Sequence, residues 1–168
     1  AKYGGAIYAN SELAIEKGKF INNSAKSFGG AIINFKDTAI KNTAFSKNTS
    51  GVDGGAIYQS GSSTFALENT SFSENGCNRN GGAVYLNKNV AAKIESTNFN
   101  GNESNRTGGA IFIQSNNKNE VEVKGCEFKG NGSNFGGGIY LNTNSKLKLE
   151  QSKFVINQGA FGAGISTA

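Results

Sequence analysis

Residues 54–75 read GGAIYQSGSSTFALENTSFSEN and contain the two signals that decide the fold, a glycine doublet at Gly54-Gly55 and a Phe-x-x-Asn motif at Phe72 and Asn75. The doublet recurs along the chain at intervals of 25, 25, 27, 27, 28 and 26 residues, the last copy being Gly-Ala. Self-similarity at such a period is typical of stacked repeats, in which each unit buries its apolar face against its neighbours. We therefore expect one β-solenoid segment over residues 1–168.

The spacing within each repeat indicates that the units are β-strands. From the doublet to the Phe the distances are 16, 16, 18, 18, 20 and 18 residues, whereas the return to the next doublet takes 8 or 9. Because side chains alternate between the two faces of an extended chain, an insertion of two residues keeps every side chain on its own face. The extra length is expected at one corner of each coil.

Columns of equivalent residues predict the inside and the outside of each coil. The third residue after the first glycine is Ile or Val seven times, and an aliphatic residue stands five positions before each Phe. The next position contains only Glu or Lys, mostly of opposite sign in successive units, and in the neighbouring outward column Lys93, Glu122 and Lys148 alternate. We expect the apolar columns to face the core, and the charged columns to face water and to pair between coils. With three strands per coil, this is an all-β, right-handed, single-stranded parallel β-helix of about 6–7 coils, each 25–28 residues long.

The Phe-x-x-Asn motif predicts two structural ladders. Amides at equivalent positions of stacked strands can hydrogen-bond along the rod axis, and aromatic rings can stack in the same direction. The members are Phe20, Phe45, Phe72, Phe99, Phe128 and Phe154, with Asn23, Asn48, Asn75, Asn102, Asn131 and Asn157.

Charge and hydropathy limit the partners. The 168 residues include 17 Lys and Arg against 12 Asp and Glu, a net charge of +5, with the two signs interspersed. Nucleic-acid binding needs a concentrated basic patch, so we expect no nucleic-acid partner. No apolar run approaches the roughly 20 residues of a membrane span, so we expect no direct membrane insertion by this segment. The chain starts and stops within a repeat without a polar cap, which favours a piece of a larger protein or assembly.

Catalytic chemistry has little support in the sequence. Carbohydrate-active β-helices work with clustered carboxylates, often with calcium. Here Asp37 and Asp53 are the only aspartates, histidine is absent, and most glutamates fall in the charged column opposite lysines. We expect no enzymatic activity, no cofactor and no metal site, with a carbohydrate-active enzyme as a minor alternative.

An arginine patch is the first candidate binding surface. Arg79 and Arg106 both stand two residues before a doublet, in successive units. Asp53 and Asn80 occupy the position just before a doublet, which is aromatic at both ends of the chain. Guanidinium groups suit planar oxyanions, so the patch predicts recognition of a carboxylate or sulfate. The alternative is a solvated turn.

An aromatic stripe is the second candidate surface. The residue after the inward Ile or Val is aromatic in five units, and alternation directs it outward. Such a row predicts a contact site for sugars, a partner or a neighbouring copy. The alternative is that the rings stack from coil to coil and stabilise the solenoid. The members are Tyr8, Tyr58, Tyr85, Phe112 and Tyr140.

The two cysteines are not expected to form a disulfide. Cys77 follows Phe72 in a loop, whereas Cys126 falls in an inward column two units later. Two strand spacings of about 4.8 Å place them beyond the roughly 7 Å reach of a disulfide. We expect Cys126 to be buried and Cys77 to be a free thiol or a contact for a partner.

The alternation of two motifs connects the chain to a known family. Gly-Gly-Ala-Ile at 4–7, 29–32, 54–57 and 108–111, and Gly-Gly-Ala-Val at 81–84, each followed by Phe-x-x-Asn, resemble the repeats of chlamydial polymorphic outer membrane proteins over nearly the whole chain. The resemblance implies an autotransporter passenger β-helix, displayed outside the bacterial outer membrane as an adhesin. We therefore expect an extracellular or cell-surface module that binds a receptor or glycan of a host or neighbouring cell. The alternative is a structural subunit of an extracellular filament or coat, whose partners are copies of itself.

Overall fold

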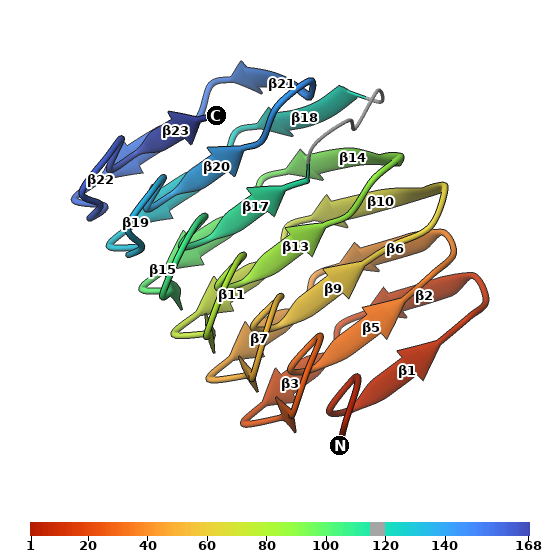
Figure 1. The fold of residues 1–168 in the computed structure, drawn as a ribbon. Coiled ribbons are helices and arrows are strands. Elements are labelled where there is room, and N and C mark those ends of the chain that lie inside the picture. Colours follow the sequence, from red (N-terminus) through yellow and green to blue (C-terminus); the bar gives the residue numbers. More distant parts are fainter. Residues whose placement is uncertain (115–119) are drawn as a thin grey trace.

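The chain winds into a right-handed parallel β-helix of about six turns. The computed structural model describes residues 1–114 and 120–168, and Figure 1 shows their coils stacked one on another from the N-terminus to the C-terminus. The described residues contain no helix, and hence none long and apolar enough to cross a bilayer. The predicted fold class is confirmed.

The described strands form four parallel sheets that run along the rod. The doublet sheet contains β1 (Ile7–Ala9), β5 (Ile32–Asn34), β9 (Ile57–Gln59), β13 (Val84–Leu86), β17 (Ile111–Ile113), β20 (Ile139–Leu141) and β23 (Ile165–Thr167). The charged sheet contains β2 (Leu13–Glu16), β6 (Thr38–Lys41), β10 (Ser63–Glu68), β14 (Val90–Glu95), β18 (Glu120–Lys124) and β21 (Lys146–Glu150). The Phe sheet contains β3 (Lys19–Ile21), β7 (Ala44–Ser46), β11 (Ser71–Ser73), β15 (Asn98–Asn100), β19 (Glu127–Lys129) and β22 (Lys153–Val155).

A fourth sheet adds to the three strands per coil that the sequence predicts. Its strands are only two residues long and follow the Phe-x-x-Asn motif directly. We call it the short sheet; it contains β4 (Ser24–Ala25), β8 (Thr49–Ser50), β12 (Gly76–Cys77) and β16 (Glu103–Ser104). Strands this brief have no apolar alternation of their own, so the sequence pattern does not reveal them.

The insertions lengthen strands of the charged sheet. The strands β2 and β6 have four residues, whereas β10 and β14 have six. In both cases the aligned part keeps its register, as in the pairing of Phe65 with Thr38. The extra residues thus enter at the predicted corner, between the doublet sheet and the charged sheet. The longest insertion falls between Gly108 and Phe128, and its residues 115–119 lie outside the described residues.

Equivalent residues lie directly over one another and form the core. Ile57 pairs with Ile32 on one side and with Val84 on the other, and all three are fully buried. The rings of the Phe ladder stack with centroids 4.7–5.0 Å apart and planes within 7° of parallel. Full burial of a large apolar side chain contributes about 1.5–3 kcal/mol, so this repeated column is a main source of stability.

The predicted amide ladder is also present. Nδ2 of Asn75 donates to Oδ1 of Asn102 at 2.9 Å, and Oδ1 of Asn75 accepts from Nδ2 and the backbone N–H of Asn48 at 2.9 and 3.0 Å. The second amide hydrogen of Asn75 reaches the carbonyl oxygen of Phe45 at 3.1 Å. The Nδ2-to-Oδ1 bond links successive members all the way from Asn23 to Asn157. The ladder therefore satisfies polar groups that would each cost about 1–3 kcal/mol if buried alone.

The two glycines of each doublet are required for different reasons. The first has a positive φ in all seven doublets, for example 72° at Gly81, which an L side chain rarely adopts. The second has an ordinary φ but no room, because a Cβ on Gly82 would overlap the carbonyl oxygen of Gly109 in the next coil. The same overlap with the following doublet recurs at Gly5, Gly30, Gly55 and Gly109.

The charged columns face water, but their pairing only partly runs between coils. Lys41 of β6 reaches Glu68 of β10, with Nζ and Oε2 2.7 Å apart. Lys93 instead pairs at 3.2 Å with Glu95 of its own strand, and no ion pair of the described residues joins it to Glu122 of the neighbouring strand. The expectation of coil-to-coil pairing at Lys93 is wrong, because a side chain two positions along the same strand face is also within a lysine's reach.

Candidate functional site

The aromatic stripe lies on the outer face of the doublet sheet, yet four of its five rings are buried or half-buried. Tyr85 and Phe112 are only 6% and 4% exposed, and Tyr58 and Tyr140 are half-buried. Tyr8, in the first coil, is the exception at 61%. The expectation of an exposed stripe is therefore wrong for the central coils.

The rings are buried by one another and by the residues beside them. The rings of Tyr58 and Tyr85 stack at 4.7 Å, and those of Tyr85 and Phe112 at 4.8 Å. At the ring edges, Asn87 donates to the Tyr58 hydroxyl at 3.1 Å, and the Tyr85 hydroxyl donates to Gln114 at 3.2 Å. This burial raises the pKa of the Tyr58 hydroxyl to about 12. Stacking between coils, the alternative that the sequence left open, is thus what these rings do.

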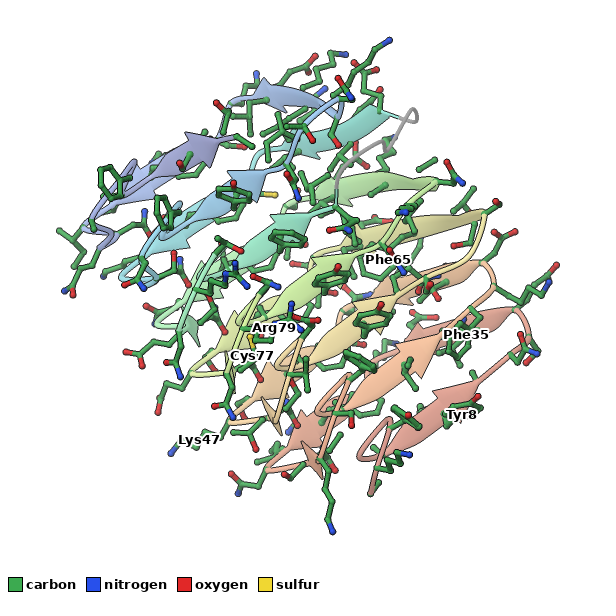
Figure 2. The ribbon with its side chains drawn as sticks, in the orientation of Figure 1. Tyr8, Phe35, Lys47, Phe65, Cys77 and Arg79 are labelled. Carbon is green, nitrogen blue, oxygen red and sulfur yellow. The ribbon has the colours of Figure 1, made fainter. Side chains whose placement is uncertain are left out.

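Arg79 and Arg106 lie on the surface at the corner that precedes the doublet sheet, and Figure 2 shows Arg79 near the middle of the rod. The backbone fixes them one coil apart, since the N–H of Arg106 donates to the carbonyl oxygen of Arg79 at 3.0 Å. Neither arginine takes part in an ion pair within residues 1–114 and 120–168. Two like charges held at neighbouring coils favour an anion between or above them.

The other two residues of the arginine patch lie beneath the surface. Asp53 is 6% exposed and Asn80 is 8% exposed, so they support the arginines instead of presenting themselves for binding. Asn80 donates its backbone N–H and its Nδ2 to Oδ1 of Asp53 at 3.1 and 2.9 Å, and Thr107 donates its hydroxyl to Oδ1 of Asn80. Burial raises the pKa of the Asp53 carboxyl, and the charge of Arg79 opposes that rise.

The structure brings the two arginines and three members of the aromatic stripe together in one hollow of about 250 Å³. We call it the basic groove; it is lined by Arg79, Asn80, Tyr85, Arg106, Thr107, Phe112, Gln114, Tyr140 and Asn142. Because the rings stack along the rod axis, their faces cover each other and their edges line the groove. Ring edges carry the positive side of the aromatic quadrupole, the same sign as the guanidinium groups. The groove is therefore suited to an anion.

A second hollow, of about 290 Å³, lies at the N-terminal coils of the same sheet face. We call it the aromatic pocket; it is lined by Tyr3, Tyr8, Phe28, Ile33, Phe35, Tyr58 and Ser60. Here Ile33 interrupts the aromatic column between Tyr8 and Tyr58. The Tyr8 ring is tilted by 56° against Phe35, close to which it lies in Figure 2, so the two rings do not stack in parallel. Sequence reasoning missed this pocket, although the single aliphatic residue in an aromatic column was a signal for it.

The cysteines are both free and both buried. Cys126 lies in the core as predicted, with its Sγ 3.5 Å from the carbonyl oxygen of Ile94. Cys77 lies in β12 and is 7% exposed, because the short sheet turns it inward; the interpretation as a partner contact in a loop is wrong. Burial raises the pKa of the Cys77 thiol to about 12, which makes it unreactive at neutral pH.

The acidic side chains at the one like-charged rung of the charged column are paired with lysines. Glu68 and Glu95 lie in register on β10 and β14. Glu68 bonds to Lys41 at 2.7 Å and Glu95 to Lys93 at 3.2 Å. Among the described residues, no three His, Cys, Asp or Glu side chains are grouped so that they could hold a metal ion.

Similarity to known proteins reaches the level of the family. A family model described as "Right handed beta helix region" matches residues 1–154, which include the basic groove and the aromatic pocket. No curated protein and no solved structure matches the chain. Since the match covers most of the 168 residues, the chain belongs to the right-handed β-helix family.

Proposed function

We propose that this chain is a non-enzymatic recognition module of a cell surface or extracellular structure, which binds anionic groups of a glycan in the basic groove. The observation that carries the proposal is the meeting of Arg79 and Arg106 with the ring edges of Tyr85 and Phe112 in one hollow. A guanidinium group binds a carboxylate or sulfate through two parallel hydrogen bonds, and this geometry gives specificity as well as affinity.

The β-helix supplies a rigid scaffold for this groove. The N–H of Arg79 donates to the carbonyl oxygen of Val52 at 2.9 Å, and Arg106 bonds to Arg79 in the same way. Behind them, the buried hydrogen bonds of Asp53, Asn80 and Thr107 tie three coils together. Because the backbone of the binding residues is already fixed in the free protein, less conformational entropy is lost when the ligand binds.

Two features support surface display without catalysis. The alternating Gly-Gly-Ala-Ile and Phe-x-x-Asn motifs resemble those of chlamydial polymorphic outer membrane proteins, which supports an adhesin that contacts a receptor or glycan of another cell. Glu68 and Glu95, the neighbouring carboxylates of the charged column, are each neutralised by a lysine, which is unlike a catalytic acid and base.

The test is binding to immobilised sulfated and carboxylated glycans. A hydrogen bond to a charged group contributes about 1.5–3 kcal/mol, so we expect Arg79→Ala with Arg106→Ala to weaken binding at least about tenfold. The matched control is Lys19→Ala with Lys129→Ala, which removes the same charge from exposed positions of the Phe sheet. Equal binding by the two double variants would refute the proposal, and electron micrographs of fibres without any glycan binding would favour the filament subunit.

A further inference from the structure

We infer that the ligand is a linear acidic oligosaccharide that lies along the rod axis, with an acidic group in the basic groove and an uncharged sugar ring in the aromatic pocket. This inference rests on the proposed function and deepens it, because it names the shape of the ligand and adds a second binding site. The two hollows lie along the same outer face of the doublet sheet. Tyr58 lines the aromatic pocket, Tyr85 lines the basic groove, and their rings stack at 4.7 Å.

The length of the face that the two hollows cover together requires an extended ligand. Tyr8 stands on β1 and Tyr140 on β20, which are five strand spacings apart in the doublet sheet. At about 4.8 Å per spacing, the face is about 24 Å long between these residues. A single monosaccharide can occupy only one of the hollows, whereas a chain that runs along the rod contacts both.

The chemistry of the two hollows differs. The lining of the basic groove includes two guanidinium groups, whereas no charged side chain lines the aromatic pocket. On the side of the aromatic pocket, Ile33 stands where the next aromatic ring would stack on Tyr8, and the Tyr8 ring is tilted by 56° against Phe35, so this side of the ring is available to a ligand. The face of an aromatic ring carries the negative side of the quadrupole and attracts the C–H groups of a sugar ring. The matching ligand is charged over one part of its length and neutral over another.

A saccharide fits this face better than a peptide does. Sheets capture extended peptides at a free strand edge, where unpaired backbone groups add a strand. The strands between the two hollows are paired on both sides, β9 with β5 and β13, and β13 with β9 and β17. Beside the rings, short amide and hydroxyl side chains line the two hollows, among them Ser60, Gln114 and Asn142. Such groups both donate and accept hydrogen bonds, as sugar hydroxyls do.

Calorimetry with a chain-length series, from the disaccharide upward, tests the inference. κ-Carrageenan oligosaccharides supply sulfates and hyaluronan oligosaccharides supply carboxylates, and in both an acidic ring alternates with an uncharged ring, so the pair separates the two sources of charge. We expect affinity to rise with length until the chain reaches both hollows and then to level off. Tyr8→Ser should weaken the long oligosaccharides about fivefold, the worth of one aromatic contact, and leave the disaccharide unchanged. The control is Ile21→Ser, which removes an apolar side chain of similar exposure, 53%, from the Phe sheet.

The outcomes distinguish this inference from the proposed function. If the arginine variant loses binding but neither chain length nor Tyr8→Ser has an effect, the second site is wrong and the basic groove stands. If binding is independent of the arginines at every length, the proposed function itself fails. If a poly-glutamate peptide binds as tightly as the oligosaccharides and with the same loss on Tyr8→Ser, the ligand is not a saccharide. Circular dichroism of each variant confirms that the coil is intact.

Discussion

Asn75→Ala removes one side chain on which four hydrogen bonds of the amide ladder depend. Asn75 accepts two bonds from Asn48 and donates one each to Phe45 and Asn102, and it is 1% exposed. Alanine leaves two donors of Asn48 and the carbonyl oxygen of Phe45 without these partners. Oδ1 of Asn102 keeps the bond from the backbone N–H of residue 75 at 3.1 Å.

The expected cost follows from the three groups that lose a partner. Each polar group left unsatisfied inside a protein costs about 1–3 kcal/mol. Allowing for partial relaxation, the free energy of unfolding should fall by about 5 kcal/mol, a large share of the roughly 5–15 kcal/mol that stabilises a typical domain.

Asn23→Ala is the matched control from the same column. Asn23 donates its Nδ2 to Asn48 at 2.9 Å and is half-buried, but no described asparagine donates to it in turn. The cost should be about 1 kcal/mol, that of one ordinary hydrogen bond. Urea titration followed by circular dichroism measures both variants, and amide exchange of the Asn48 N–H reports the local defect. Equal costs for the two variants, or unchanged exchange at Asn48 in the Asn75→Ala variant, would refute the ladder as a source of stability.

Three further outcomes follow from the coil geometry. Gly82→Ala is expected to cost about 3 kcal/mol in urea titrations, because its Cβ would overlap the carbonyl oxygen of Gly109; a cost near that of an ordinary surface change would contradict this steric explanation. Asp53→Asn is expected to raise the Tm at neutral pH, since burial raises the folded-state pKa of this carboxyl and ionisation therefore opposes folding. That gain should vanish as the pH falls below about 4, where the wild-type carboxyl is protonated in both states, and the opposite sign would disprove the argument. Cys77 and Cys126 are expected to resist alkylation at neutral pH in the folded protein and to react in denaturant, so rapid labelling of either one, seen by mass spectrometry, would show that it is not buried.

The core was predictable because, in a β-helix, residues at equivalent positions of successive repeats lie in contact. Aligning the repeats in the sequence therefore also gives the contacts of the core. Once the Phe-x-x-Asn motifs are superposed, the neighbours of Phe72 are necessarily Phe45 and Phe99, as the structure shows. Alternation then assigns each remaining residue of a strand to the core or to the outside.

The outer surface was less predictable, because alternation says only which way a side chain leaves its strand. It does not say that stacked neighbours and the residues beside them cover Tyr85, nor that Arg79 would line the same groove. Nor does it choose between two acidic partners at similar distances, which is why Lys93 pairs within its strand. The inward turn of Cys77 depends on a two-residue strand that leaves no periodic trace.

The entry of extra residues at a single corner has a consequence for how such a chain can evolve. Lengthening β10 or β14 by a pair of residues leaves the registers of the doublet sheet and the Phe sheet untouched. The corner between the doublet sheet and the charged sheet can thus change its shape through insertions of two residues, while the other corners of the coil stay the same. Selection can reshape what the molecule presents to its surroundings without a matching change in its interior.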